Sequence, residues 1–276
     1  MIVATTGADL REIVKSFAGK KVLVPTMGAL HEGHLELIRM ARQAAGPHGA
    51  VMVSIFVNPI QFDRPADLAA YPRPLEADFP ACEGEGVDLV FAPEIASMYH
   101  ADRSITVTES LLSKGLCGGS RPGHFDGVCT VVLKLFLLSA CDAAVFGAKD
   151  FQQLAIVRRM VRDLDVPVEI IECPTVRESD GLAMSSRNTR LTAAQRADAP
   201  RIRRALQMAA MMGTPAEILK IARAEIGASP LTRIDYLSLV DAETLQPLTE
   251  ISRPVILATA VFYGKVRLID HVRISC

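Results

Sequence analysis

The sequence carries almost no net charge. Its 276 residues include 30 Lys and Arg against 31 Asp and Glu, which gives a formal charge of −1 at pH 7. Proteins that bind nucleic acids or anionic membranes through electrostatics usually carry a basic excess. The charge balance therefore predicts no nucleic-acid partner and no membrane partner, and any recognition of anions must come from a local site.

Closely spaced cysteines, a signal peptide and a membrane span are also missing. The cysteines form no C-x-x-C pair, which is typical of reduced, mostly buried thiols. They are Cys82, Cys117, Cys129, Cys141, Cys173 and Cys276. The N-terminus has no basic start followed by a long apolar stretch. The stretch closest to a membrane span, 128–146, contains Lys134 and Asp142, and we interpret its first half as a buried helix that leads into a strand. These features predict a cytoplasmic protein.

Half of the residues are apolar, which is enough for a sizeable core. Short apolar runs at 21–25, 50–57, 88–93, 143–148 and 167–174 alternate with helical patterns, among them 34–45 and 74–85. This alternation predicts an α/β fold with a doubly wound parallel sheet. We assign this domain to residues 1–180.

The pattern changes in the last third of the chain. Residues 192–212 are expected to be helical, and a second helix is expected to begin with Thr214 as N-cap and Pro215 in its first turn. Three strand-like runs (233–241, 253–262 and 265–272) follow without intervening helices. We therefore expect a smaller α+β domain with an antiparallel sheet over residues 181–276.

Polar segments follow four of the predicted strands. They are PTMGALHEGH (25–34), NPIQF (58–62), GAKD (147–150) and TVRESDGLAMSSRN (175–188). In open parallel sheets, ligands bind beyond the carboxyl ends of the strands. The four segments therefore predict a binding site at this edge of the sheet.

The first segment has the features of a phosphate site. Gly28 and Gly33 allow a ligand to approach the backbone, and a helix that begins near Gly33 would direct free N–H groups and its positive dipole end at an anion. His31 and His34 are three residues apart and can donate hydrogen bonds to phosphoryl oxygens. Two other interpretations stay open: the histidines only cap the helix or pack, or they bind zinc, for which no downstream cluster supplies further ligands.

The other segments offer complementary groups. Lys149 can neutralise phosphate charge, and Asp150 can cap a helix or orient the lysine. Ser185, Ser186 and Arg187 form a possible grip for an anion, although a polar linker is the alternative. Asn58 and Gln61 are neutral amides suited to a carboxylate or a hydroxyl, and the role of His124 stays open.

Familiar catalytic signatures are absent. The sequence contains neither G-x-x-x-x-G-K-[ST] nor G-x-G-x-x-G, and no serine or cysteine has an adjacent partner that would suggest a triad. We therefore expect electrostatic positioning of a nucleotide rather than covalent catalysis or hydride transfer.

The sequence resembles the pantothenate synthetase family over nearly its whole length. The matching segments, in the family's order and spacing, are PTMGALHEGH, SIFVNPIQF, YPR (71–73), SRPGHFDGV, FGAKDFQQL and VRESDGLAMSSRN, with RLID (267–270) near the end. HEGH is similar to the HIGH-type signature of nucleotidyltransferases, and SSRN is similar to their second, basic-serine signature. The main rival is a related nucleotidyltransferase with a different acceptor, against which the glutamines of NPIQF and DFQQL argue. A nucleotide-binding module without catalysis is the rival from another class.

The resemblance implies an enzyme that converts ATP and pantoate into pantoyl adenylate and pyrophosphate, and then pantoyl adenylate and β-alanine into pantothenate and AMP. It also implies a Rossmann-like N-terminal domain, a smaller C-terminal domain that closes over the site, a homodimer, and Mg²⁺ with ATP.

The resemblance further implies site residues. His34, as proton donor, and His31, Lys149 and Arg187 would be catalytic. Gln61 and Gln153, with Asn58 beside them, would bind pantoate, Gln61 would also meet β-alanine, and Asp78 would be the metal ligand. The ATP site would comprise Pro25, Met27, Gly28, His31, His34, Gly147, Lys149, Asp150, Val176, Met184, Ser185, Ser186 and Arg187.

Overall fold

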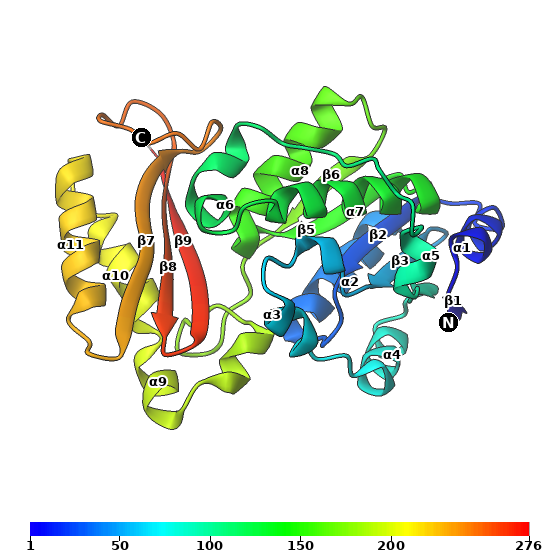
Figure 1. Ribbon diagram of the computed structural model, residues 1–276, viewed down its shortest axis with the longest axis horizontal. Helices are drawn as coiled ribbons and strands as arrows, with labels where there is room; N and C mark the ends of the chain where they lie inside the picture. Colours follow the sequence, from blue (N-terminus) through cyan, green and yellow to red (C-terminus); the bar gives the residue numbers. More distant parts are fainter. Residues whose placement is uncertain (276) are drawn as a thin grey trace. The chain divides into compact units, whose positions relative to one another are not determined.

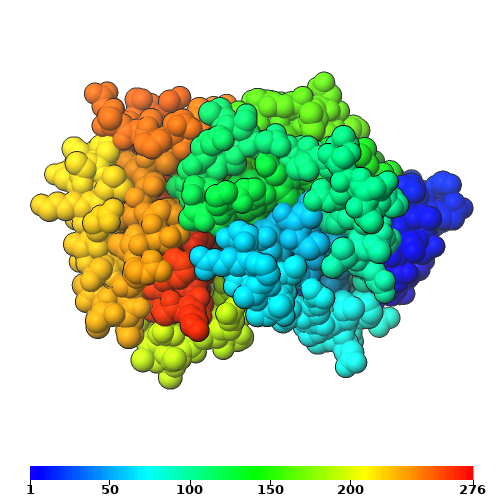
Figure 2. Space-filling model, viewed as in Figure 1, coloured from blue at the N-terminus to red at the C-terminus, as the bar shows by residue number. Residues whose placement is uncertain are grey.

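The computed structural model describes residues 1–275, which form two compact units (Figures 1 and 2). The first unit comprises Met1–Glu109, Arg121–Ala148 and Ile156–Pro174. The second unit comprises Ser110–Ser120, Lys149–Ala155 and the chain from Thr175 onward. The predicted domain boundary after residue 180 thus falls a few residues beyond the point where the chain finally enters the second unit. Cys276 of the sequence analysis lies outside the described residues.

The first unit is built on a six-stranded parallel sheet with the strand order β1-β4-β3-β2-β5-β6. The strands are β1 (Ile2–Ala4), β2 (Lys21–Thr26), β3 (Ala50–Ile55), β4 (Leu89–Phe91), β5 (Ala143–Gly147) and β6 (Glu169–Cys173). The chain runs outward from β2 through β3 to β4 and then returns to β5 beside β2. The predicted doubly wound, Rossmann-like sheet is confirmed, and its topological switch point lies between β2 and β5.

Helices pack against this sheet, among them α2 (Glu32–Ala45), α4 (Leu75–Gly84) and α7 (His124–Ser139). The first unit also contains α1 (Gly7–Val14), the short helices α3 (Pro65–Ala69) and α5 (Ile95–Met98), and most of α8 (Phe151–Asp163). Leu37 and Ile38 of α2 and Cys82 of α4 pack on alternate residues of the strands, such as Val24 and Val53. The residues between them are equally buried on the other face, which explains why β3 is apolar at nearly every position.

The ladder between β2 and β5 ends early. It pairs Val22 with Ala143 and Leu23 with Ala144, whereas the ladder with β3 continues to Thr26. Pro25 has no N–H with which to extend a ladder. The carboxyl end of β2 at the switch point is therefore joined to β3 alone.

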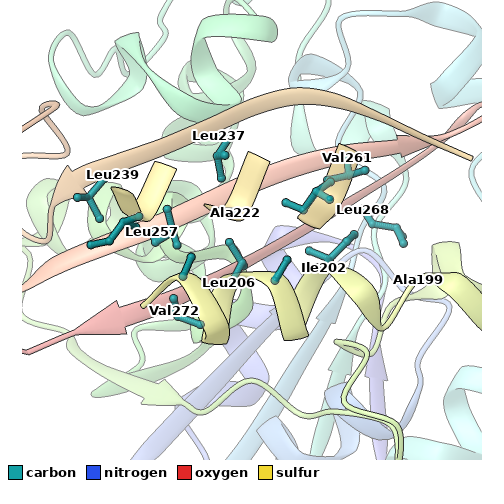
Figure 3. Close-up of a cluster of buried hydrophobic side chains, with 14 of the residues drawn as sticks. Ala199, Ile202, Leu206, Ala222, Leu237, Leu239, Leu257, Val261, Leu268 and Val272 are labelled. Atoms are coloured by element: carbon teal, nitrogen blue, oxygen red, sulfur yellow. The ribbon is translucent and has the colours of Figure 1, made fainter. Parts of the chain in front are cut away.

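The second unit has a three-stranded antiparallel sheet, β7 (Thr232–Asp241), β8 (Val255–Tyr263) and β9 (Val266–Ile274), as predicted. It also contains α6 (Leu116–Ser120), α9 (Ala193–Asp198), α10 (Arg201–Ala209) and α11 (Pro215–Gly227). Figure 3 shows its core, in which Ile202, Leu206 and Ala222 of the helices face Leu257 and Val261 of β8. The short 3₁₀ segments of the chain are η1 (Pro59–Gln61), η2 (Leu112–Lys114), η3 (Ala148–Asp150) and η4 (Ser186–Arg190).

Two predictions about the helices of this unit have different outcomes. Thr214 caps α11 by accepting a hydrogen bond from the Glu217 N–H, with Pro215 in the first turn, as predicted. The single helix expected over 192–212 is wrong, because Pro200 separates α9 from α10. Proline cannot donate a backbone hydrogen bond, and its ring clashes with the preceding helical turn.

The cysteines and the apolar stretch are as predicted. Among the described residues, four cysteines are buried and Cys117 is partly exposed. Burial raises the pKa of the Cys82 thiol to about 12 and that of Cys141 to about 11, so both remain protonated at neutral pH. The stretch 128–146 belongs to the buried helix α7 and to β5. Within residues 1–275, no helix has both the length and the apolar character that a bilayer crossing requires.

Candidate functional site

The loop after β2 begins with a glycine that no other residue can replace without strain. Gly28 has a φ of 78°, and a Cβ atom there would lie 2.9 Å from Asp78 Oδ2 and 2.9 Å from Ile55 Cγ2. Both the backbone angle and the close contacts require the absence of a side chain. The predicted special role of Gly28 therefore has a structural cause at the switch point of the sheet.

Asp78 holds this loop. Its side chain is buried in the first turn of α4, where Oδ2 accepts a hydrogen bond from Ala29 N (2.9 Å) and Oδ1 accepts one from Leu30 N (2.8 Å). Both carboxylate oxygens are thus engaged with the backbone. Metal ligation by Asp78 remains a prediction, and it would compete with these two contacts.

The two histidines form a reciprocal cap at the start of α2. His31 is the N-cap and accepts a hydrogen bond from Gly33 N at its Nδ1 (3.1 Å), and His34 Nδ1 accepts one from His31 N (3.3 Å). Their ring centroids lie 4.1 Å apart. Because an accepting Nδ1 carries no hydrogen, the hydrogen of each neutral imidazole is on Nε2.

Capping and phosphate binding are therefore compatible at these histidines. The Nδ1 atoms satisfy backbone N–H groups at the helix end, and the Nε2–H groups are the donors that can meet an anion. The capping alternative of the sequence analysis is correct for Nδ1. The zinc alternative has no support, because residues 1–275 contain no group of three or more His, Cys, Asp and Glu that could hold a metal ion.

Asn58 and Gln61 follow β3 and are joined to each other. Both side chains are buried, and Asn58 Nδ2 donates to Gln61 Oε1 (2.9 Å) and to Gly127 O (3.0 Å). Gln61 Nε2 lies 3.2 Å from the Sδ atom of Met27. A residue predicted for pantoate and a residue predicted for ATP are therefore neighbours in the first unit.

The backbone at Gln61 is also supported from α7. His124 Nδ1 lies 2.8 Å from Gln61 O, and Arg121 Nη2 donates to the same oxygen (3.3 Å). A Cβ atom on Gly127 would lie 2.5 Å from Ile60 O, so glycine is needed for this close approach. His124, whose role the sequence left open, thus contacts the η1 turn that carries Gln61.

The second unit contains the segment from Lys149 to Gln153. The Lys149 ammonium lies 3.8 Å from Asp150 Oδ2, just before α8. The buried Gln152 accepts a hydrogen bond from Cys117 N and donates to Leu112 O and Gly115 O. Of the adjacent glutamines, Gln152 thus holds the loop 112–117, whereas the side chain of Gln153 is only partly buried.

The predicted segment 175–188, also in the second unit, is held by several hydrogen bonds. Arg177 and Ala183 form a β-bridge, and Met184 N donates to Val176 O (3.0 Å). Ser185 caps η4 by accepting a hydrogen bond from Arg187 N (3.2 Å), and Arg187 is exposed. The serines and Arg187 therefore follow an ordered turn rather than a loose linker.

Sequence reasoning missed the residues that support these segments. Tyr99, whose hydroxyl donates to Asn58, belongs to no motif that stands out in the sequence, and the buried Gln152 lies in the segment DFQQL without a structural role being predicted for it. Asp78 was noticed, but for a different role. The contacts of these residues span long distances along the chain, so local patterns gave no signal for them.

The six-stranded parallel sheet and the loop at its switch point define a Rossmann-like α/β protein. The family model for pantoate-beta-alanine ligase matches residues 2–273. The sequence is 55% identical to the pantothenate synthetase of Akkermansia muciniphila, covering 92% of each chain. It is 52% identical to that of Desulfovibrio desulfuricans, covering 91% of this chain and 90% of the relative. The chain belongs to the pantoate–β-alanine ligase family, and it is a ligase of pantothenate synthesis.

Solved structures agree with this membership. The pantothenate synthetase from Thermus thermophilus superposes with a TM-score of 0.94 at 43% identity, and each chain is covered completely. The pantoate-beta-alanine ligase from Francisella tularensis, described as complexed with beta-gamma ATP and beta-alanine, has a TM-score of 0.82 at 33% identity. That comparison covers 99% of this chain and 97% of the other.

Proposed function

We propose that the enzyme activates pantoate as an acyl adenylate and then transfers the pantoyl group to β-alanine. In the first step a pantoate carboxylate oxygen attacks the α-phosphorus of ATP, and pyrophosphate leaves. In the second step the amine of β-alanine attacks the acyl carbon, loses a proton, and displaces AMP. The observation that carries this proposal is the 3.2 Å contact between Gln61 Nε2 and Met27 Sδ, which joins the predicted acyl-substrate residue to the predicted nucleotide loop.

The first unit would supply the start of the ATP site. Gly28 allows the phosphates to approach the backbone, and the N-terminus of α2 favours negative charge there. The Nε2–H groups of His31 and His34 would donate to phosphate oxygens. Attack at phosphorus requires in-line positioning and charge neutralisation rather than a protein nucleophile. His34 would stabilise charge or donate a proton through this same atom.

The second unit would supply the remaining charge. Lys149 and Arg187 carry positive charge that can offset the departing pyrophosphate, and Ser185 and Ser186 can donate hydrogen bonds. Gln153 keeps the role of binding pantoate that the family resemblance implied. The backbone of the remaining predicted residues, Pro25, Gly147, Asp150, Val176 and Met184, would complete the nucleotide site.

Residues 1–275 contain no group of three or more His, Cys, Asp and Glu that could hold a metal ion, so the protein alone offers no complete site for Mg²⁺. Mg²⁺ commonly binds proteins through one or two carboxylates together with substrate phosphates. We propose that Mg²⁺ enters on the triphosphate of ATP, and we assign it no step. The homodimer and the cytoplasmic location that the family resemblance implied also stay predictions.

The first step can be tested by itself through ATP–pyrophosphate exchange. With pantoate present and β-alanine absent, labelled pyrophosphate should enter ATP, because pantoyl adenylate forms reversibly. Without pantoate, no exchange is expected. Exchange that needs β-alanine, or no exchange at all, would rule out a free-standing adenylation step.

A further inference from the structure

The orientation of the Asn58 side-chain amide is fixed by its neighbours. The carbonyl oxygen of Gly127, 3.0 Å from Asn58 Nδ2, can only accept a hydrogen bond. The atom that faces it must therefore be the NH₂ group. Asn58 is 1% exposed, so a reversed amide would place two oxygens against each other without water to separate them.

The oxygen atom of the Asn58 amide also has a partner, which is Tyr99. Its hydroxyl donates to Asn58 Oδ1 across 2.8 Å, and its ring lies beside Phe56, with a centroid separation of 6.0 Å. Arg103 and Lys134 lie over the same ring, 5.4 Å and 5.8 Å from its centroid. Burial raises the pKa of Tyr99 above its ordinary value, so the hydroxyl keeps its proton at neutral pH.

The chain of contacts continues to Gln61. The second hydrogen of Asn58 Nδ2 is donated to Gln61 Oε1 at 2.9 Å, so the NH₂ end of the Gln61 amide lies on the side of Met27, to whose Sδ atom Nε2 donates at 3.2 Å. If Gln61 reversed its amide, two NH₂ groups would face each other. The polarity that Gly127 sets, and that the Tyr99 hydroxyl supports by donating to Asn58 Oδ1, is thus passed through Asn58 to Gln61.

We infer that Tyr99 is a positioning residue for the acyl substrate, acting through Asn58 to hold the Gln61 amide with its N–H donors toward that substrate. The inference rests on the proposed function of Gln61. It also specifies a class of contact, because the substrate atom that meets Gln61 must be an acceptor, that is, a hydroxyl or carboxylate oxygen. A substrate analogue that offers only a C–H group at this position would leave the buried donor unpaired.

The test is Tyr99→Phe, which removes the hydroxyl and keeps the ring. In the exchange assay, kcat/KM for pantoate should fall about tenfold or more, since the buried Asn58 Oδ1 loses its donor and the Asn58–Gln61 pair is held less firmly. The change should appear as a higher KM for pantoate, with the KM for ATP unchanged. Tyr263→Phe is the matched control, because it removes a buried tyrosine hydroxyl that donates to Asp198 in the second unit.

Coupling to Gln61 separates positioning from a general structural role. In a Gln61→Ala background, Tyr99→Phe should cause little further loss in pantoate use, whereas a merely structural tyrosine would give additive losses. An unchanged KM for pantoate in Tyr99→Phe, or fully additive losses, would overturn the inference. If the wild-type enzyme shows no pantoate-dependent exchange, the proposed function fails instead.

NMR of the side-chain amides tests the hydrogen bonds from Tyr99 through Asn58 to Gln61 in the wild-type protein, without a variant. In wild-type protein labelled with ¹⁵N-asparagine and ¹⁵N-glutamine, the Asn58 NH₂ group should exchange slowly with solvent. The Gln61 NH₂ resonance should shift when pantoate is added. Rapid exchange at Asn58, or a Gln61 resonance that pantoate does not move, would contradict the proposed relay.

Discussion

At the residue scale, different atoms of the same side chain have different roles. In His31 and His34, Nδ1 completes the helix cap, and the proposed contact with an anion is assigned to the other ring nitrogen, Nε2. Asn58, which the sequence suggested for substrate binding, uses its amide within the protein and supports Gln61. The division of tasks between the atoms of these side chains depends on partners that are distant in sequence, so the sequence could not predict it.

The cap suggests a substitution that separates the two tasks of His34. His34→Gln should keep the cap, because glutamine at the third helical position can accept from the N-cap N–H. His34→Ala should lose the cap and about 1 kcal/mol of unfolding free energy. Both variants should lower exchange about a hundredfold or more, because both lack the imidazole donor. Urea unfolding and the exchange assay provide the two measurements.

The comparison of the two variants tests the alternative that His34 only caps the helix. If His34→Gln retains wild-type exchange while His34→Ala loses both stability and activity, the histidine acts only as a cap. The predicted result is instead a stable glutamine variant with little adenylation.

At the element scale, the segment before Ser185 is clamped to β9. Arg177 makes a bidentate ion pair with Asp270, at 2.8 and 2.9 Å, and also donates to Gly181 O. The Asp270 side chain is only 5% exposed, so the Arg177 guanidinium takes the place of water around its carboxylate. The ion pair therefore holds the loop that leads to the predicted anion grip.

Loss of this clamp should be costly. Arg177→Met would leave a buried carboxylate unpaired, which typically costs about 3–5 kcal/mol of unfolding free energy. We expect lower stability in urea and a higher KM for ATP. Arg158→Met, which removes the partner of the more exposed Glu172, is the control and should cost about 1 kcal/mol or less. Equal losses in the two variants would show that Arg177 is an ordinary surface residue.

The elements also show how far sequence patterns extend. Long, strongly apolar runs such as 50–57 predicted their strands, because burial on both faces leaves a clear pattern. The strand β1 and the helix α1 were not predicted. Two of the three residues of β1 are exposed, so it lacks the apolar pattern by which the equally short but fully buried β4 was predicted. The break between α9 and α10 was visible as Pro200, and giving more weight to that proline would have avoided the error.

At the scale of the whole molecule, the topology of the sheet explains where the first unit places its polar residues. The strand order reverses between β2 and β5, and the loops after β2 and β3 carry the histidines and Gln61. Parallel strand direction could be predicted from the alternation of strands and helices. The strand order could not, because it is set by long-range packing, and neither could the support that Asp78 and Tyr99 give to these loops.

The central claim, that the carboxylate of pantoate is activated on the α-phosphorus of ATP, is tested most directly by an oxygen label. The enzyme is supplied with ATP, β-alanine and pantoate that carries ¹⁸O in both carboxylate oxygens, and the masses of the products are measured by mass spectrometry. The account predicts one ¹⁸O atom in AMP, one in the amide of pantothenate and none in pyrophosphate. Unlabelled AMP would contradict it.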